Sequence, residues 1–428
     1  MLRLEAVMKM RRKLERAGML PLSRQAVTCS RVIDERLKHI MPRAMAAAGI
    51  DFWLVLASEG NEDPISRTFF TWDMRQARRL NAFMFYQAAD GAVRYMSAGV
   101  KSPFMAELYE DVGLPKEDVF ECVARIIAEL DPQKIALNQS KEYPPCDGLL
   151  ATQKENLFKV LPGKFCGRIV SAEPLAVYWM QHSTGIEKKL LQCISEVTKD
   201  IIREVFSAEY VEPGRTNTAD LEWAIREHIA ALGFHFHFSL DVDLQRCGES
   251  DTRLAGTTVL PGDLLHCDVG MCSTFIPLHT DIQQVAYVRR EEETAAPAGL
   301  EALMKQANNF ENIVAEEMAR GGTGNEVLAR ALSRGRENGL RPMLYTHPLG
   351  TLGHGVGPLV GLYDDQNFVP HRGEQTVIPD TCYALEFNVT GAVPEWSDQN
   401  VVMYLEEDVC LEEELYYLNG RQTELILI

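Results

Sequence analysis

The pattern of hydrophobic and polar positions divides the chain into a helical arm and two mixed domains. Apolar residues recur at helical spacing over residues 5–17 and again from Ser30 onward, and the uninterrupted apolar run at residues 52–57 predicts a buried strand. Three more strands and a helix are predicted in the first domain, at residues 81–86, 93–96 and 134–137 and at residues 118–129. The pattern therefore predicts three parts, namely an arm over residues 1–29, an α/β domain over residues 30–178 and a larger domain over residues 179–428.

The larger domain, which opens with a predicted long helix, contains a predicted hairpin that carries two aspartates. A turn signal precedes its first strand, and alternation along that strand places His266, Asp268 and Gly270 on one face. Residues 281–288 are typical of the returning strand, which would bring Asp281 opposite Asp268. Two like charges so close repel each other unless a cation lies between them. For this pair alone, two acids on a surface hairpin are the simpler interpretation.

Three further candidate metal ligands lie in the last quarter of the sequence. His354 has a glycine on each side, which allows another segment or a ligand to approach its ring closely. Glu386 stands at the centre of an apolar strand, where a buried carboxylate needs a cation or a strong hydrogen-bond donor. A later strand offers Glu406 beside Glu407, and strand alternation does not choose between them. Together with the two aspartates, these groups suit a pair of divalent cations.

Two other patterns in the larger domain admit more than one interpretation. Residues 235–244 alternate cleanly, so His235 and His237 share one face; a metal site is the more specific interpretation, and a solvated strand face is the commoner one. Glycine-rich loops at residues 213–221 and 321–327 each precede a predicted helix, and the absence of a Walker pattern favours helix caps over phosphate-binding loops. Their similarity indicates a duplication in which a long helix, a capped helix and a strand pair occur twice.

Composition and charge narrow the possible partners. The chain has 428 residues, of which 46% are apolar and 24% charged, as in ordinary globular proteins. Its net charge of −18 argues against nucleic acid and anionic membrane surfaces as partners. No apolar run approaches the roughly 20 residues that a membrane helix requires. The ten cysteines are scattered without a Cys-x-x-Cys motif, which is typical of free thiols in a reducing compartment and predicts a cytoplasmic location.

The order Asp-x-Gly, Asp, Gly-His-Gly, Glu, Glu resembles the superfamily of methionine aminopeptidase, Xaa-Pro aminopeptidase, prolidase and creatinase. The motifs lie within residues 186–428, and the domain ahead of them resembles the N-terminal domain of the prolidase and creatinase branches. The resemblance implies an α+β protein with a pita-bread catalytic domain, built from two halves related by a pseudo-two-fold axis. It also implies two divalent metal ions, of Mn, Fe, Co or Zn, and a homodimer.

The resemblance further implies roles for the five matching residues. Asp268 would hold one ion, His354 and Glu386 would hold the other, and Asp281 and Glu406 would bridge them. The superfamily's run of an aliphatic residue, glutamate, two acidic positions and an aliphatic residue selects Glu406 as the second bridging group. Glu386 would in addition carry protons during catalysis.

Three accessory histidines of the similar peptidases are missing from this chain. The position four residues before His354 holds Gly350, and the position seven residues after it holds Gly361. The third position, 17 residues ahead of Asp268, falls within Glu-Ser-Asp at residues 249–251. These histidines bind substrate and stabilise the tetrahedral intermediate in the similar enzymes, so their absence weakens the peptidase interpretation and leaves the metal interpretation intact.

Other histidines are candidates to compensate. We predict His347 as a catalytic group, and His279 and His266 as substrate-binding groups. The first two acidic ligands are separated by 281 − 268 = 13 positions, which is longer than is usual in the superfamily. This spacing predicts an enlarged loop between the two strands of the hairpin.

The sequence therefore predicts a metal-dependent hydrolase that resembles Xaa-Pro aminopeptidases and dipeptidases and cleaves a peptide or amide bond in a short peptide or other small molecule. One alternative is a metal-dependent lyase of the same superfamily. The missing histidines favour it, whereas His266 opposes it, because the dimethylsulfoniopropionate-cleaving lyases carry an aspartate base at that place. A second alternative is a catalytically inactive binding module, which the five retained ligands oppose.

Overall fold

The computed structural model describes residues 2–99 and 101–428, which form two compact units. The smaller unit comprises residues 21–186 and 275–277, and the larger one comprises the chain up to Leu20 and residues 187–274 and 278–428. The predicted arm over residues 1–29 is divided between them, because Pro21 separates helix α1 (Leu4–Arg16) from helix α2 (Leu22–His39). None of the helices in the described ranges is both long and apolar enough to cross a membrane.

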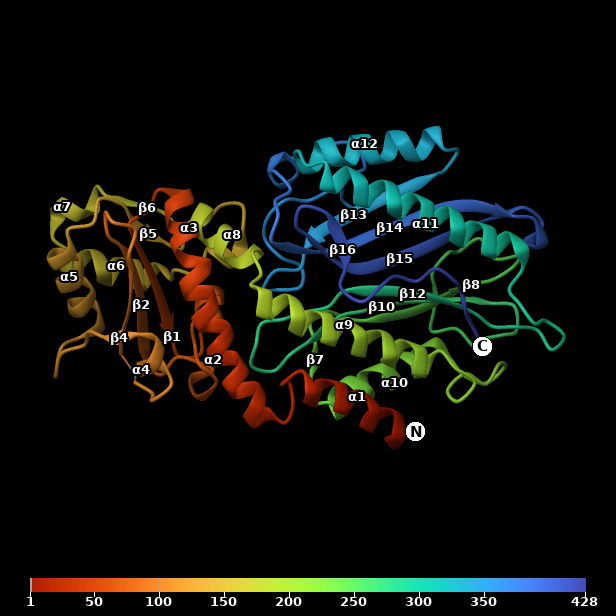
Figure 1. Cartoon of the computed structure of the whole chain (residues 1–428), viewed down its shortest axis with the longest axis horizontal. Helices are drawn as coiled ribbons and strands as arrows, with labels where there is room; N and C mark the ends of the chain where they lie inside the picture. The colour runs from red at the N-terminus through yellow and green to blue at the C-terminus, as the bar shows by residue number, and fades with distance from the viewer. Residues whose placement is uncertain (1, 100) are drawn as a thin grey trace. The chain divides into compact units, whose positions relative to one another are not determined.

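The smaller unit is built on a six-stranded sheet in the order β4-β3-β2-β1-β5-β6. Its strands are β1 (Phe52–Ser58), β2 (Leu80–Gln87), β3 (Val93–Ala98), β4 (Glu110–Asp111), β5 (Ile135–Leu137) and β6 (Ile169–Ser171). Its other helices are α3 (Met41–Ala48), α4 (Met105–Leu108), α5 (Val119–Leu130), α6 (Ala151–Val160), α7 (Gly163–Cys166) and α8 (Glu173–Gln181). Strand β1 is apolar from Phe52 to Ala57 because helices cover both faces of the sheet (Figure 1). Phe52 packs into the cluster beneath α5, and Trp53 contacts Trp179 of α8 on the opposite face.

The larger unit contains a nine-stranded sheet whose main order is β13-β14-β15-β12-β10-β8-β9, with β16 beside β15 and β17 beside β12. Its strands are β8 (Asp241–Gln245), β9 (Leu254–Ala255), β10 (Leu264–Val269), β12 (Ile282–Tyr287), β13 (Pro342–Pro348), β14 (Thr381–Val393), β15 (Gln399–Leu411), β16 (Leu415–Tyr417) and β17 (Ile426–Leu427). Its main helices are α9 (Gly185–Val205), α10 (Thr218–Ala231), α11 (Ala298–Ala319) and α12 (Gly324–Glu337).

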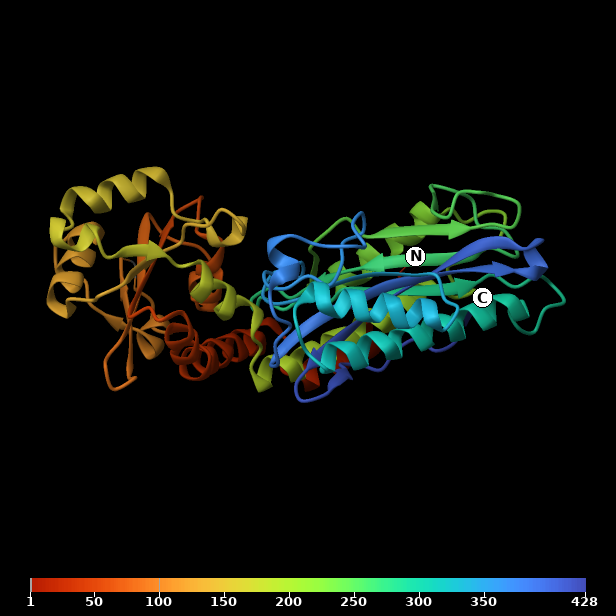
Figure 2. The same cartoon turned by 90° about the horizontal axis from the view of Figure 1, so that it is seen from above.

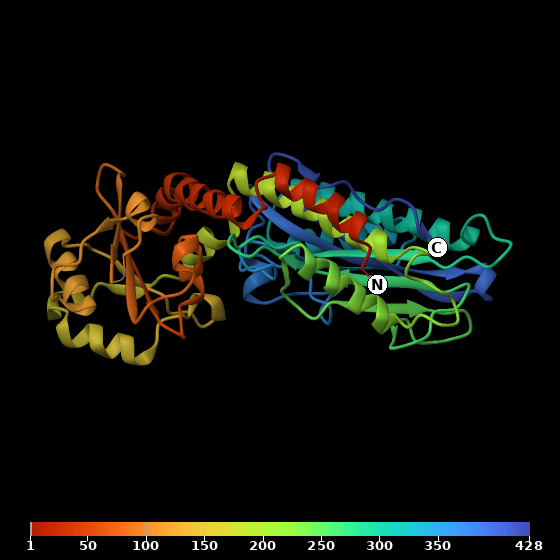
Figure 3. The same cartoon turned by 90° about the horizontal axis from the view of Figure 1, so that it is seen from below.

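The element order of the larger unit repeats as the sequence predicted. A long helix, a capped helix and paired strands occur first as α9, α10 and β8-β10-β12, and again as α11, α12 and β13-β14-β15. Both glycine-rich loops are helix caps: Asn217 begins α10 and Thr323 begins α12, each with a capping box. Helices α11 and α12 lie side by side over their strands (Figure 2). Helix α1 lies along α9, where Lys13 pairs with Glu196 and Asp200 (Figure 3).

One predicted strand is broken in the structure. Residues 235–244 do not form a single element: β7 (His235–Phe236) ends before His237, and β8 begins only at Asp241. Strand β7 instead pairs with β11 (Met271–Cys272) in a separate two-stranded sheet. The even alternation therefore does not correspond to one polar face, and His237 lies in the connection between two different sheets.

Candidate metal centre

Four neighbouring strands place acidic and amide side chains in one row across the large sheet. Asp268 of β10 lies opposite Gln283 of β12, Gln283 lies opposite Glu406 of β15, and Glu406 lies opposite Glu386 of β14. Directly opposed residues project to the same face of a sheet, so this register brings together groups from four strands. Asp281 directly precedes β12, two residues before Gln283, and therefore shares that face.

The register corrects one detail of the predicted hairpin, because Gln283 and not Asp281 lies opposite Asp268. Gln283 is the amide that joins the row, since its Nε2 donates to Glu386 Oε1 and to Glu406 Oε2, both at 2.9 Å. The backbone N–H of Asp281 donates to Asp408 Oδ1 at 3.0 Å and so fixes the chain at the start of β12.

The acidic side chains are crowded; Asp281 and Glu406 are buried, and Asp268 and Glu386 are partly buried. Burial, and next the charge of Asp281, raise the pKa of Asp268 and of Glu406 well above their usual values. The same causes raise the pKa of Glu386 to about 7. Among the described residues, Asp268 Oδ1 and Glu406 Oε1 are buried and accept no hydrogen bond. Buried carboxylate oxygens that face one another without donors fit the oxygen-rich ligand set of divalent cations.

The loop after β13 brings an imidazole to these acids. His354 Nε2 lies 3.2 Å from Asp281 Oδ2, and the hydrogen bond between them raises the pKa of His354. The glycine motif has a packing reason, because a Cβ at Gly355 would lie 2.5 Å from the Pro348 carbonyl oxygen. Arg372 holds the loop by donating to the carbonyl oxygens of Gly355 and Gly357.

His347 lies at the end of β13 and faces the same acids. Its Nε2 is 3.8 Å from Asp281 Oδ2 and 4.0 Å from Glu406 Oε1. Burial lowers the pKa of His347 to about 4, so the ring is neutral at physiological pH. Nδ1 lies 3.2 Å from the Pro348 carbonyl oxygen, which accepts only, so Nδ1 carries the proton and Nε2 presents its lone pair to the acids.

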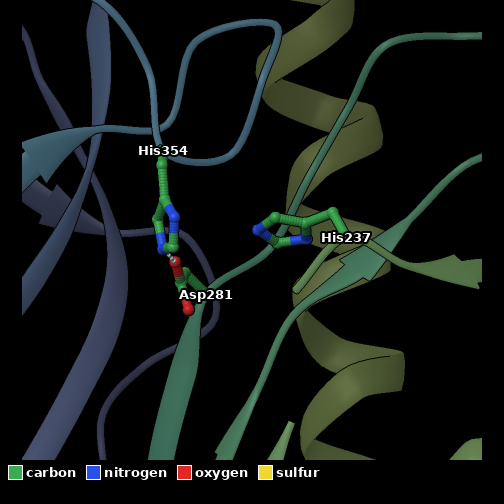
Figure 4. Close-up of side chains that lie close together, drawn as sticks. All are labelled: His237, Asp281 and His354. Atoms are coloured by element: carbon green, nitrogen blue, oxygen red, sulfur yellow. Dashed lines mark ion pairs between the residues drawn. The ribbon is translucent and has the colours of Figure 1, made fainter. Parts of the chain in front are cut away.

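Two groups of three side chains have the spacing of metal ligands. One consists of Asp281, His347 and Glu406, and the other of His237, Asp281 and His354, which Figure 4 shows. Within each group, one candidate ligand atom from each residue lies within 4.8 Å of the others. Asp281 belongs to both groups and is therefore placed between two potential ion positions.

The two predicted substrate-binding histidines have different surroundings. His279 is buried two residues before Asp281, and its ring centroid lies 4.9 Å from that of His237. His266 is 1% exposed, with Nε2 2.9 Å from Gln283 Oε1 and Nδ1 3.3 Å from Asp243 Oδ1. Both ring nitrogens of His266 are thus engaged within the sheet. Nε2 lies against the Gln283 amide, and the substrate-binding role of His266 stays a prediction.

Sequence reasoning did not assign roles to Gln283 and His237. Gln283 has a detectable signal, since it shares strand parity with Asp281, but the exact register with β15 is needed to recognise that it touches both glutamates. The sequence pairs His237 with His235 on one face of a regular strand, with a metal site as the more specific interpretation and a solvated face as the commoner one. Its proximity to His354 depends on the break after β7, which the regular alternation conceals.

The positions that hold accessory histidines in the similar peptidases have glycine for geometric reasons. Gly361 has φ +79°, and a Cβ there would lie 2.1 Å from the Leu344 carbonyl oxygen. Gly350 has φ +52°, also in the left-handed region. A histidine at Gly361 would require the backbone of β13 to move. The imidazoles beside His354 come instead from His237 and His347, and His279 lies beside His237.

Comparison with known proteins supports the fold. No protein-family model and no curated protein matches the sequence. An X-Pro aminopeptidase from Thermotoga maritima is similar in structure, with 14% identity, a TM-score of 0.64, and coverage of 90% of this chain and 100% of that one. An Xaa-Pro dipeptidase from Bacillus anthracis has 16% identity, a TM-score of 0.59, and coverage of 93% and 100%. Zn-substituted aminopeptidase P from E. coli has 14% identity, a TM-score of 0.58, and coverage of 91% and 95%.

These likenesses span both units and nearly the full length of each compared protein. At such low identity they establish the course of the backbone. The chain therefore has the two-domain, pita-bread fold of X-Pro aminopeptidases and prolidases.

Proposed function

We propose that the protein is a metal-dependent hydrolase of the Xaa-Pro peptidase type, which cleaves a peptide or amide bond in a short substrate. The observation that carries the proposal is the row of acids on three strands, Asp268, Glu406 and Glu386, with Asp281 at the start of a fourth strand and His354 beside it. Such a concentration of like charge is unfavourable without cations, and no structural requirement of the sheet explains it. The shared fold with X-Pro aminopeptidases gives this centre a known catalytic context.

The five residues implied by the resemblance are suited to hold two divalent ions. We assign Asp268 to one ion, His354 and Glu386 to the other, and Asp281 and Glu406 to both. When bound, divalent ions of this kind lower the pKa of water toward neutrality and polarise a carbonyl group. Four carboxylates with few imidazoles favour Mn or Fe over a structural zinc site.

The protein's own groups would position the substrate and move protons. Glu386 lies directly opposite Glu406, where its carboxylate would take a proton and return it beside the proposed ions. Gln283 holds Glu386 and Glu406 in fixed orientations through its two hydrogen bonds. His347 presents a neutral Nε2 toward the acids and offers a hydrogen-bond acceptor on the same face.

A non-peptidase activity is the second candidate, and the backbone at Gly361 favours it. The φ of +79° and the 2.1 Å approach to Leu344 leave no room for the histidine that the similar peptidases carry there. A metal-dependent lyase that acts on a small molecule would have no need of that residue. The engagement of both nitrogens of His266 within the sheet argues against that residue as the lyase's base.

A turnover assay distinguishes these proposals. The metal-free protein is loaded separately with Mn²⁺, Fe²⁺, Co²⁺ and Zn²⁺ and tested on Xaa-Pro dipeptides, and on tripeptides with proline in the second position. We expect Mn²⁺ or Fe²⁺ to support hydrolysis, with Glu386→Gln as the inactive control. Bound metal without hydrolysis of any of these peptides would refute the peptidase proposal and favour the lyase.

A further inference from the structure

His237 occupies a position that its own strand pairing fixes beside the metal-binding face. Strand β7 pairs with β11 so that Phe236 lies opposite Met271, and continuing this antiparallel register brings His237 opposite Gly270. Gly270 ends the Asp-x-Gly motif that begins at Asp268. The break after β7 thus delivers an imidazole to the end of the first acidic strand.

Two motif glycines make room for this ring. A Cβ at Gly270 would lie 2.2 Å from His237 Cε1, and a Cβ at Gly353 would lie 2.3 Å from His237 Nε2. Gly270 follows the first acidic strand, and Gly353 immediately precedes His354. Both segments therefore approach the ring more closely than any residue with a side chain would allow.

The nitrogens of His237 have no protein partner. Both are buried, and neither makes a hydrogen bond within the part of the chain that the structure describes. The neighbours of the ring are Phe238, His279 and His354, whose ring centroids lie 4.7, 4.9 and 5.7 Å away and whose planes are steeply inclined to it. An imidazole held so firmly with both nitrogens unsatisfied indicates a ligand that it binds.

The unsatisfied ring is directed at the pair formed by Asp281 and His354. Figure 4 shows the His237 ring pointing toward that pair from the right, with His354 above Asp281. One ligand atom from each of these three residues lies within 4.8 Å of the others. Metal–ligand bonds of about 2.0–2.2 Å place ligand atoms up to about 4.4 Å apart, so small side-chain movements complete a common site.

We propose that His237 is an additional imidazole ligand of the divalent cation held by Asp281 and His354. This inference rests on the proposed metal centre and extends it, because the resemblance implies only one histidine among the ligands. A second imidazole shifts the preference of this ion position toward Co²⁺, Zn²⁺ or Fe²⁺, whereas the carboxylate-rich remainder suits Mn²⁺. The two positions therefore differ in their preferred cation.

The test is a metal titration of the full-length chain after chelator treatment. Calorimetry with Co²⁺, Zn²⁺ and Mn²⁺ is compared for the wild type, His237→Ala and the control His235→Ala, which removes an exposed histidine two residues away. We expect His237→Ala to weaken Co²⁺ and Zn²⁺ at one position by at least about 10-fold. The loss for Mn²⁺ should be smaller, and the control should match the wild type.

The visible absorption of the Co²⁺-loaded protein provides a readout that does not depend on activity. His237→Ala should alter the band intensity, and added imidazole, which fits the space left by the side chain, should restore both the spectrum and the affinity. If His237→Ala is poorly folded by circular dichroism, His237→Gln serves the same comparison with more of the side chain kept.

Each outcome bears on one proposal. Unchanged Co²⁺ affinity and spectrum in a folded His237 variant would overturn the assignment, and a simultaneous fall in turnover would make His237 a substrate contact instead. A wild-type protein that binds no divalent cation would overturn the metal centre itself, which separates the failure of the proposed function from the failure of this inference.

Discussion

Substituting Asp281 by asparagine should stabilise the metal-free protein while abolishing its response to metal. The charge of Asp281 is the largest electrostatic cause of the raised pKa values of Asp268, Glu386 and Glu406. Asparagine has nearly the same shape, and the backbone hydrogen bond to Asp408 does not involve the side chain of residue 281. The variant therefore removes repulsion without creating a cavity.

The size of the stabilisation expected for metal-free Asp281→Asn follows from the raised pKa of Glu386. Its pKa rises from 4.5 to about 7, and at 1.36 kcal/mol per pKa unit this costs the folded state about 3 kcal/mol above pH 7. Burial contributes most of that shift, so removing the charge of Asp281 should return about 1 kcal/mol. The ion pair that is lost with His354 offsets little of this gain, because the His354 side chain is 56% exposed.

The raised pKa of Glu386 also sets the direction in which the stability of the metal-free protein changes with pH. Because the folded pKa of Glu386 lies above its unfolded value, the folded state binds more protons between about pH 4.5 and pH 7, and metal-free wild type should lose stability as the pH rises through this window. Urea unfolding at pH 5 and pH 8 with a chelator measures this loss, which should be smaller in Asp281→Asn.

A parallel titration with Mn²⁺ completes the experiment. An ion at a free concentration of 100 times its dissociation constant stabilises a protein by about 2.7 kcal/mol. The wild type should show this stabilisation, and Asp281→Asn should not. The reasoning would be refuted if metal-free Asp281→Asn were less stable than metal-free wild type at pH 8, or if Mn²⁺ stabilised both proteins equally.

Three other substitutions test separate parts of the account. Glu406→Gln should abolish metal retention, measured by elemental analysis. Glu407→Gln should retain metal but lower the free energy of unfolding in urea by about 3 kcal/mol, because it leaves the buried Lys199 without its ion-pair partner. Gly361→Ala should destabilise the fold by about 1–3 kcal/mol, because φ is +79° and the new Cβ would meet the Leu344 carbonyl oxygen. A variant that unfolds at the same urea concentration as the wild type would contradict this geometry. Gln283→Leu removes a hydrogen bond that lowers the pKa of Glu386. The acid limb of the pH–rate profile should therefore move to higher pH. A limb that does not move would show that the Gln283 amide does not set this pKa.

Strand alternation, the apolar strand context and the resemblance together point to acids that the structure brings into one row. An acid within an apolar strand, as at Glu386, has few physical explanations, and a glycine on each side of His354 indicates close packing. Strand alternation alone did not decide between Glu406 and Glu407, but the structure separates them: Glu406 faces Gln283, and Glu407 pairs with Lys199 on the opposite side.

The features that were missed depend on register and on breaks in regular structure. Gln283 became recognisable only when its alignment with β15 was known. Regular alternation through residues 235–244 predicted one strand, yet tertiary pairing of β7 with β11 overrides it and redirects His237. The contacts of His266 were equally hidden, because its partners, Asp243 and Gln283, come from neighbouring strands.

Anomalous diffraction from crystals grown with Mn²⁺ tests the central claim most directly. We expect two manganese peaks in each chain, one beside Asp268 and one beside His354 and Glu386, with Asp281 and Glu406 between them. An ordered structure in which these five side chains surround no peak, or in which manganese binds only elsewhere, would contradict it.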